Sequence, residues 1–416
     1  DAAYLLLDGL SNGGHHHLDG NSLPRLTLFD RIWLADNDYF KAPVKFHNSV
    51  TVFRDGQSAA IPPCAELVAA GQSPRYGYSR TRLANYAGVD WTRTIIWLRQ
   101  QQAFAVLDRL TALDDNEYQF RTLWHGVGAA KLSDDGLLLT QKGPSLWVQI
   151  APGPVLELHD DAELGANWRG YEHAEPVVRS LEAVSTVKLA KGESYLFASV
   201  LHGKADGIAE PWGLDFLDRA DGVRLSTADG VLDLVLDPAR SRARDGSFET
   251  DAQCMVVSGD GLTLLGATRA SSADRELLKS AEPASVDLDA EKTPESLRKI
   301  ALRRPVPNLV AAADAPPHPI QWCVRPNPVR GGDKAASAAP WHFSRLASAA
   351  LDEPGRPDAV LAATTEGMLF ALNADGSTRW SFDAGAQLND VVADDLTGDG
   401  KDEIILARQD GHVQVL

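Results

Sequence analysis

Three consecutive histidines near the start of the chain are the residues most suited to metal or acid–base chemistry. They lie in "GGHHHLDG", an apolar stretch follows and ends at Asp36, and "HNSVTV" begins at His47. Alternate side chains of an extended segment point to the same side, so His15 and His17 share a face and His16 points away. Two imidazoles and a carboxylate at the ends of neighbouring strands are a common ligand set for zinc, with water or substrate completing the coordination.

Two ordinary explanations of the same stretch stay open at this point. A purification tag is usually a longer histidine run at a terminus, whereas this run is internal and is flanked by strand-like sequence. The histidines can also be hydrogen-bonded residues of a surface or core. The spacing of the histidines alone does not distinguish such hydrogen-bonded residues from metal ligands.

The elements that must position these residues are strands. Short β-branched and aromatic runs with a period of two recur between Gly, Asp and Pro turns, as in "HNSVTVFRDG", "YQFRTLWHG" and "GVLDLVLDPAR". This pattern is typical of an all-β protein with a large antiparallel two-sheet β-sandwich. We expect the sandwich to cover residues 1–270.

Composition changes after the predicted sandwich. In "KTPESLRKIALRR", Thr293 is a candidate N-cap, Pro294 stands in the first turn and the apolar residues have helical spacing. The proline-dense "APPHPIQWCVRPNPVRGG" that follows has no sheet periodicity. We therefore expect residues 271–340 to be a Pro-rich linker with a short helix.

The last part of the chain repeats itself. Residues 357–372 align with residues 401–416 at an offset of 44. Short strands with a period in the forties are typical of β-propeller blades, so residues 341–416 are expected to form a partial propeller.

One turn within this repeat has the pattern of a cation-binding loop. "DLTGDGKDE" resembles the calcium loops of FG-GAP/VCBS-type propeller repeats, in which a tight turn brings oxygen ligands onto one hard cation. The expected calcium ligands are Asp395, Thr397, Asp399 and Glu403, with the carbonyl of Lys401. A polar Asp-Gly turn without an ion is the alternative.

Charge and composition exclude other classes. The net charge of −17 opposes binding of the whole chain to nucleic acid. Three cysteines far apart indicate neither a disulfide framework nor a cysteine metal site. No apolar run is long enough to span a membrane. The chain opens on Asp1 with a strand-like "AYLLLDGL", which leads us to expect a preceding domain outside this sequence.

The order of the motifs resembles the C-terminal β-sandwich domain of the heparinase II/III family of polysaccharide lyases. That family carries a Gly-His-x-His-x-Asp stretch, then a strand ending in Asp, then a His-Asn-[Ser/Thr]-Val strand. The corresponding segments here are "GHHHLD" at 14–19, "IWLAD" at 32–36 and "HNSVTV" at 47–52. The resemblance covers roughly residues 1–270 and is concentrated in residues 13–55.

The resemblance implies zinc held by His17, Asp36 and His47, with a catalytic role for His15. In the family a Pro-Gly or similar turn usually follows the ligand Asp, whereas "DNDYF" follows here, so Asp38 is a rival to Asp36. It also implies a partner for the sandwich, an N-terminal α/α-toroid domain that supplies a tyrosine acid/base and is absent from this chain. The intact protein would be a secreted, periplasmic or cell-surface enzyme.

β-Elimination on an acidic polysaccharide explains why these residue types are needed. The proton α to a uronate carboxylate is barely acidic unless the carboxylate is neutralised and a base lies close to it. Arg80 and Arg82, within the arginine- and aromatic-rich stretch 75–93, are candidate substrate-binding residues, as is Tyr39. Solvated arginines and a tyrosine packed at a strand end are the ordinary alternatives. A non-catalytic carbohydrate-binding or adhesion scaffold with a structural metal is the alternative function.

Overall fold

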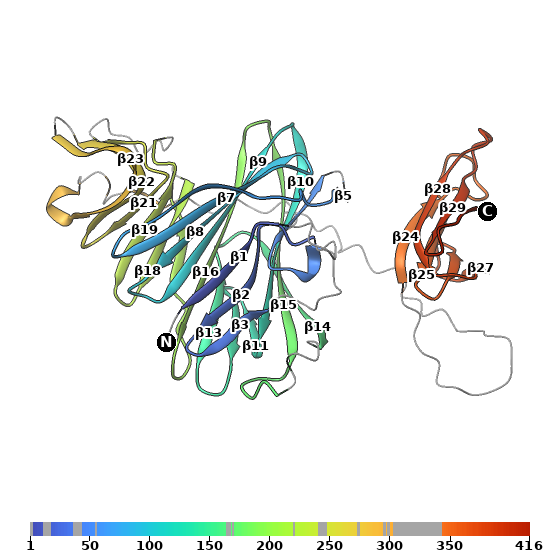
Figure 1. The fold of residues 1–416 in the computed structure, drawn as a ribbon, viewed down its shortest axis with the longest axis horizontal. Helices are drawn as coiled ribbons and strands as arrows, with labels where there is room; N and C mark the ends of the chain where they lie inside the picture. Colours follow the sequence, from blue (N-terminus) through green and yellow to red (C-terminus); the bar gives the residue numbers. More distant parts are fainter. Residues whose placement is uncertain are drawn as a thin grey trace. The chain divides into compact units, whose positions relative to one another are not determined.

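The protein is described by a computed structural model. It covers residues 3–10, 18–35, 44–54, 56–163, 168, 170–218, 221–239, 248–272, 275–293, 297, 300–302 and 343–416. Two compact units, Asp1–Asp314 and Ala315–Leu416, are distinguished, and each is described by itself. Every strand pair in both units is antiparallel, which confirms the predicted all-β fold (Figure 1). None of the helices among the described residues is long and apolar enough to cross a membrane.

The first sheet of the first unit carries the start of the chain. Its main strand order is β1-β2-β3-β10-β15-β14, and β4 pairs with both β10 and β5. The strands are β1 (Tyr4–Asp8), β2 (Ser22–Leu28), β3 (Arg31–Ala35), β4 (Val50–Arg54), β5 (Gln57–Ser58), β10 (Asn116–Val127), β14 (Val155–Glu163) and β15 (Val177–Leu189).

The second sheet packs against the first to form the predicted sandwich. Its order is β11-β12-β13-β16-β9-β8-β7-β6. The strands are β6 (Glu66–Gln72), β7 (Tyr76–Tyr86), β8 (Val89–Leu98), β9 (Ala103–Ala112), β11 (Ala129–Ser133), β12 (Gly136–Thr140), β13 (Ser145–Ile150) and β16 (Ser194–Lys204). Trp33, Trp124 and Phe104 are among the side chains buried between the two sheets.

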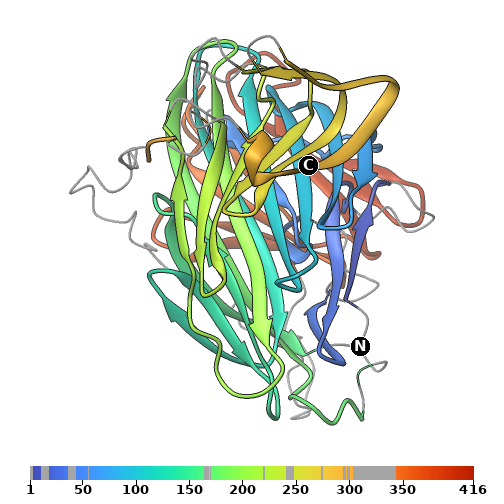
Figure 2. The ribbon, with the colours of Figure 1, turned by 90° about the vertical axis from the view of Figure 1, so that its left-hand side faces the viewer.

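A third sheet covers the other face of the second, so the unit has three layers. Its order is β17-β18-β19-β21-β22-β20, with β23 beside β22. The strands are β17 (Gly213–Phe216), β18 (Asp221–Thr227), β19 (Gly230–Leu236), β20 (Phe248–Thr250), β21 (Cys254–Ser258), β22 (Gly261–Ser272) and β23 (Arg275–Asp289). Figure 2 shows the unit from the side of this sheet.

The middle position of the second sheet has a cause in its sequence. Nine of the ten residues of β9, "AFAVLDRLTA", are buried, because its alternate side chains enter two different cores. Leu107 packs toward the third sheet, whereas Val106 packs toward the first. A near-continuous apolar run is what a strand covered on both faces requires.

Strand β23 extends the third sheet past residue 270, the expected end of the sandwich. It pairs with β22 from Arg275 to Asp289, and most of its side chains are at least partly exposed. Pro283 is tolerated there because β23 pairs with β22 alone and the ladder is irregular around it. A short 3-10 helix, η3 (Ala290–Lys292), follows. Most of the predicted helix and all of 303–342 lie outside the described residues.

The second unit contains two sheets related by the 44-residue repeat. One consists of β24 (Phe343–Ala349), β25 (Ala359–Thr364), β26 (Met368–Leu372) and β27 (Thr378–Asp383). The other consists of β28 (Leu388–Asp394), β29 (Glu403–Arg408) and β30 (Val413–Val415). Strands β25 and β29 occupy equivalent positions in the repeat, as the sequence alignment predicts.

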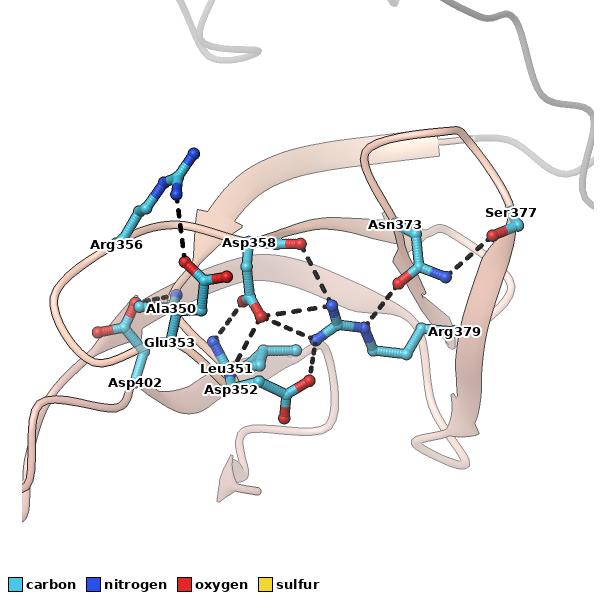
Figure 3. A network of polar contacts seen from close by, with 10 residues as sticks. All are labelled: Ala350, Leu351, Asp352, Glu353, Arg356, Asp358, Asn373, Ser377, Arg379 and Asp402. Carbon is cyan, nitrogen blue, oxygen red and sulfur yellow. Dashed lines mark hydrogen bonds and ion pairs between the residues drawn. The ribbon is translucent and has the colours of Figure 1, made fainter.

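Repeat-equivalent aspartates hold the turn that follows β24. Asp358 accepts the Leu351 amide at 2.7 Å and contacts the Arg379 guanidinium, whereas Asp402 accepts the Ala350 amide at 2.7 Å (Figure 3). Asp358 and Asp402 are 44 residues apart, so the repeat extends to the residues that fix its turns.

Candidate catalytic and metal-binding site

The segment before β4 brings His47 into the interior of the protein. A turn of 3-10 helix, η1 (Val44–Phe46), is closed by the His47 amide, which donates to the carbonyl of Val44 at 3.0 Å. His47, Asn48 and Ser49 are each at most 1% exposed. A histidine in this setting has few rotamers available, which suits a ligand or a catalytic group that must keep one orientation.

Asn48 fixes the position of this segment in the first sheet. Its side-chain amide donates to the carbonyl of Leu23 at 2.9 Å, and its side-chain oxygen accepts the amide of His125 at 2.5 Å. The ring of His125 is within hydrogen-bonding distance of the Lys45 carbonyl, with Nε2 at 3.0 Å. His125 is fully buried and acts as a support for the turn that carries His47.

A buried ion pair on the second sheet also supports the segment of His47, from the side that faces the core. Arg93 on β8 binds Asp108 on β9 through two contacts, Nε to Oδ1 at 2.7 Å and Nη2 to Oδ2 at 3.0 Å. Nη1 of Arg93 also donates to the carbonyls of Asn21 at 2.6 Å and Asn48 at 3.2 Å. Asp108 accepts a further bond from Trp91 at 2.8 Å. One guanidinium thus holds the turns that precede β2 and β4.

A groove of about 510 Å³ lies beside this segment on the outer face of the first sheet. Leu18 and η1 form one wall, next to the histidine-rich stretch in sequence. The remaining lining comes from β4, β5, β10, β14 and β15 and comprises Thr51, Phe53, Ser58, Arg121, Leu123, His159, Ser180 and Glu182. The groove is therefore a candidate place for a ligand that also reaches His47's segment.

Of the residues predicted to form the metal site, the described part of the chain contains His47. His15, His17, Asp36 and the rival Asp38 lie outside the described residues, and so does Tyr39. The zinc site and the catalytic role of His15 therefore stay predictions.

The structure assigns Arg80 to the interface of the second and third sheets, not to a substrate groove. Its side chain is 6% exposed and donates to Asp237 at 2.5 Å and to the Gln253 side chain at 3.0 Å. Arg109 holds the other oxygen of Asp237 at 2.5 Å. Burial alone would raise the pKa of Asp237, but the charges of the two arginines outweigh it and leave that pKa below its ordinary value. Arg80 has no surface left for a glycan.

Arg82 lies further along β7 on the same face as Arg80, since alternate residues of a strand share a face. Its side chain is 42% exposed and pairs with Asp90 at 2.6 Å, with Glu66 at 3.8 Å. This face is turned away from the first sheet, where His47 lies. Arg82 is accessible, but two carboxylates already neutralise it.

Sequence reasoning missed the polar residues that build the support under His47. Arg93 ends the stretch 75–93, for which a substrate groove or a solvated strand is expected, yet it is 1% exposed. The sequence contains a sign of this burial. In "TRTIIW" and "AVLDRL", alternate side chains face the first sheet, and each of these alternating sets contains one charged residue, Arg93 or Asp108. Two opposite charges in the buried phase of adjacent strands predict a buried pair.

The predicted calcium loop forms a tight turn in which the carboxylates bind backbone amides. Asp395 accepts the amides of Gly398 at 2.7 Å and Gly400 at 2.8 Å, and the Gly400 hydrogen bond is the largest cause of its lowered pKa. Glu403 accepts the amide of Leu396 at 2.9 Å, and Asp399 that of Lys401 at 2.9 Å. The segment forms a tight turn, but oxygens of Asp395, Asp399 and Glu403 do not all lie within 4.8 Å of one another, and calcium binding at Asp395, Thr397, Asp399 and Glu403 stays a prediction.

Comparison with known sequences gives one family match. Residues 359–416 match the model of the lambda-carrageenase β-propeller domain, which agrees with the blade-like repeat of the second unit. No curated protein matches the chain.

Comparison with solved structures finds heparan sulfate lyases. A heparan sulfate lyase HepC from Pedobacter heparinus is 14% identical with a TM-score of 0.43, covering 54% of this chain and 38% of that one. A structure described as heparinase III is 10% identical with a TM-score of 0.41, covering 54% and 36%. A putative kojibiose phosphorylase from the human microbiome is 6% identical with a TM-score of 0.25, covering 50% and 26%. This chain thus spans less than half the length of these proteins.

Proposed function

We propose that this protein is a polysaccharide lyase that cleaves a uronate-containing glycan by β-elimination, with the first unit supplying part of the active site. The motif order around His47 carries the proposal. Its support is the way that Asn48, His125 and the Arg93–Asp108 pair hold this histidine's segment beside a groove. A catalytic or metal-binding site requires side chains that supporting hydrogen bonds hold in one geometry.

In the proposed reaction a base removes the proton on the carbon next to the uronate carboxylate. The C–H electron pair forms a carbon–carbon double bond, the glycosidic C–O bond breaks, and the leaving oxygen takes a proton from an acid. We assign the base role to His15, because a neutral imidazole accepts a proton near neutral pH. The acid would come from a partner domain outside this sequence.

The metal has a separate part in this proposal. Zinc, when bound, would fix the geometry of the histidine-rich stretch, because elimination requires no activated water. His17, His47 and Asp36, or Asp38 in its place, would hold it. The buried and braced position of His47 fits such a ligand. Calcium at the Asp395 loop would stiffen a turn of the second unit and takes no part in the reaction.

The proposal is tested by incubating the intact protein with a panel of glycans and following the ultraviolet absorbance of the unsaturated uronate. Heparan-like glycans, alginate and ulvan-type glycans form the acidic panel, and a neutral glucan is the control. We expect product from at least one uronate glycan and none from the neutral chain. Binding without product across the acidic panel would favour the carbohydrate-binding scaffold.

A further inference from the structure

A second cluster of metal-ligand side chains lies on the outer face of the first sheet, away from the histidine-rich stretch in sequence. Glu157 and His159 point to one side of β14, and Glu182 faces them from β15. One donor atom from each residue lies within 4.8 Å of the other two. Among the described residues this is the only such group of three.

The spacing within the cluster suits a metal better than a set of hydrogen bonds. Nε2 of His159 lies 3.5 Å from an oxygen of Glu157 and 3.5 Å from an oxygen of Glu182. A charge-assisted hydrogen bond between such groups would be about 2.7–2.9 Å long. Zinc bonds of about 2.1 Å in tetrahedral geometry place neighbouring donors about 3.4 Å apart. Both distances match that separation.

The sheet register brings two carboxylates together, and Arg121 pairs with one of them. Glu157 and Glu182 are direct cross-strand partners, and like charges in that position repel. Arg121 binds Glu182 through the oxygen Oε1 at 2.9 Å, which turns the other oxygen, Oε2, toward His159. A carboxylate oriented by a second residue in this way is typical of metal ligands.

The cluster opens onto the groove beside the segment of His47. His159 and Glu182 are both part of the groove lining, and Glu182 is 13% exposed whereas Glu157 and His159 are about half exposed. A metal held by three protein ligands would therefore have its remaining position accessible from the groove. This arrangement is typical of sites that keep a water or a substrate oxygen on the metal.

We propose that Glu157, His159 and Glu182 form a zinc-type metal site whose open position faces the groove. One imidazole with two carboxylates favours zinc over calcium or magnesium, which prefer oxygen ligands alone. Its three ligands differ from the predicted ligands His17, Asp36 and His47. It does not depend on the lyase proposal, because metal binding can be measured without any glycan.

The test is titration of chelator-treated protein with zinc chloride in a calorimeter. We expect His159→Asn and Glu157→Gln each to bind one equivalent fewer than the wild type. His412→Asn is the matched control, because His412 is an exposed histidine 3.2 Å from a carboxylate of Asp410 in the second unit. It should bind as much zinc as the wild type.

Thermal unfolding provides the second readout. Zinc should raise the Tm of the first unit more in the wild type than in His159→Asn, because a ligand bound only by the folded state stabilises it. Both substitutions replace half-exposed side chains, so the variants should fold, and circular dichroism checks this. Equal zinc stoichiometry in the wild type and His159→Asn would overturn the proposal. Millimolar affinity would overturn it as well, since any exposed cluster binds zinc that weakly.

Discussion

The second sheet carries a buried arginine–aspartate cluster on each face, and the two clusters differ in what they hold. Toward the first sheet, Arg93 and Asp108 form a buried ion pair. The Nη1 group of Arg93, which does not bind Asp108, donates to the carbonyls of Asn21 and Asn48, in the turns that precede β2 and β4. Toward the third sheet, Asp237 lies between Arg80 and Arg109 and joins one sheet to the next.

The two clusters use the same kind of ion pair for different roles: one holds the turns around His47, and the other joins two sheets. Removing an ion pair from water is costly, and further hydrogen bonds from the pair to nearby backbone offset part of that cost. The Arg93 pair meets this description, since it reaches the segment of His47. The Asp237 carboxylate is 19% exposed, and the hydrogen bonds of this cluster join β7 and β9 to the third sheet and Gln253, not to the described segment of His47. We therefore expect the first cluster to matter for both stability and function, and the second for stability alone.

The largest effect is expected from Asp108→Asn. The substitution keeps the size of the side chain but leaves the Arg93 guanidinium buried without its counter-ion, which should cost about 3–5 kcal/mol of unfolding free energy. Urea unfolding of the first unit measures it, and activity on the glycan should fall as the turn of His47 loosens. A loss below about 1 kcal/mol would show that the pair is not a principal support.

A smaller effect is expected from Asp237→Asn. Arg80 keeps its hydrogen bonds to Gln253 and Arg109 keeps its ion pair with Asp221, so the loss should be about 2–3 kcal/mol. Because the folded pKa of Asp237 lies below its ordinary value of 3.8, its contribution is present above that pH and is lost as the pH falls through the folded pKa. If the proposed lyase activity is found, the kcat and KM of the remaining folded protein should not change. A changed kcat would contradict the separation of the two clusters.

Acid should weaken the second sheet through His202. Burial lowers the pKa of His202 from 6.5 to about 3, while its ring stacks on Trp212 and Nε2 lies 2.6 Å from the Gln149 side chain. The unfolded chain then binds the extra proton, so stability is complete above about pH 6.5 and falls below it by up to about 1.4 kcal/mol per pH unit. His202→Phe should flatten this slope in urea unfolding between pH 6.5 and 4. An unchanged slope would assign the acid sensitivity to other groups.

The smallest effect is expected from Arg82→Gln. Its ion pair with Asp90 is exposed, so the change in unfolding free energy should be below about 1 kcal/mol. Its face is turned away from the first sheet, so KM for the glycan should stay the same. A several-fold rise in KM would instead restore Arg82 as a substrate-binding residue.

The alternation of apolar and polar residues along the strands predicts part of the fold. The antiparallel sandwich and the 44-residue repeat follow from alternation and self-similarity, but the third sheet does not. Strand β23 is polar and contains Pro283, so its composition resembles a linker although it pairs along its length. An edge strand exposed over most of its side chains leaves little apolar signal.

The sequence predicts the motif that contains His47, but it does not predict the buried charged residues that support the segment. His47 stands out by residue type, whereas Arg93, Asp108 and Arg109 gain their roles from the direction in which each strand faces. Asp108 and Arg109 are neighbours in sequence and look like a local ion pair. The pleat sends Asp108 to the first sheet and Arg109 to the third. Only the layer order reveals that they serve different clusters.

The central claim is that base and metal are separate in the histidine-rich stretch, and one pair of variants tests it most directly. Product formation and zinc content are measured together in the intact enzyme. His15→Ala should abolish the unsaturated uronate product while zinc stays near the wild-type content, whereas His17→Ala should lose zinc and stability together. Full eliminase activity in His15→Ala would contradict the account.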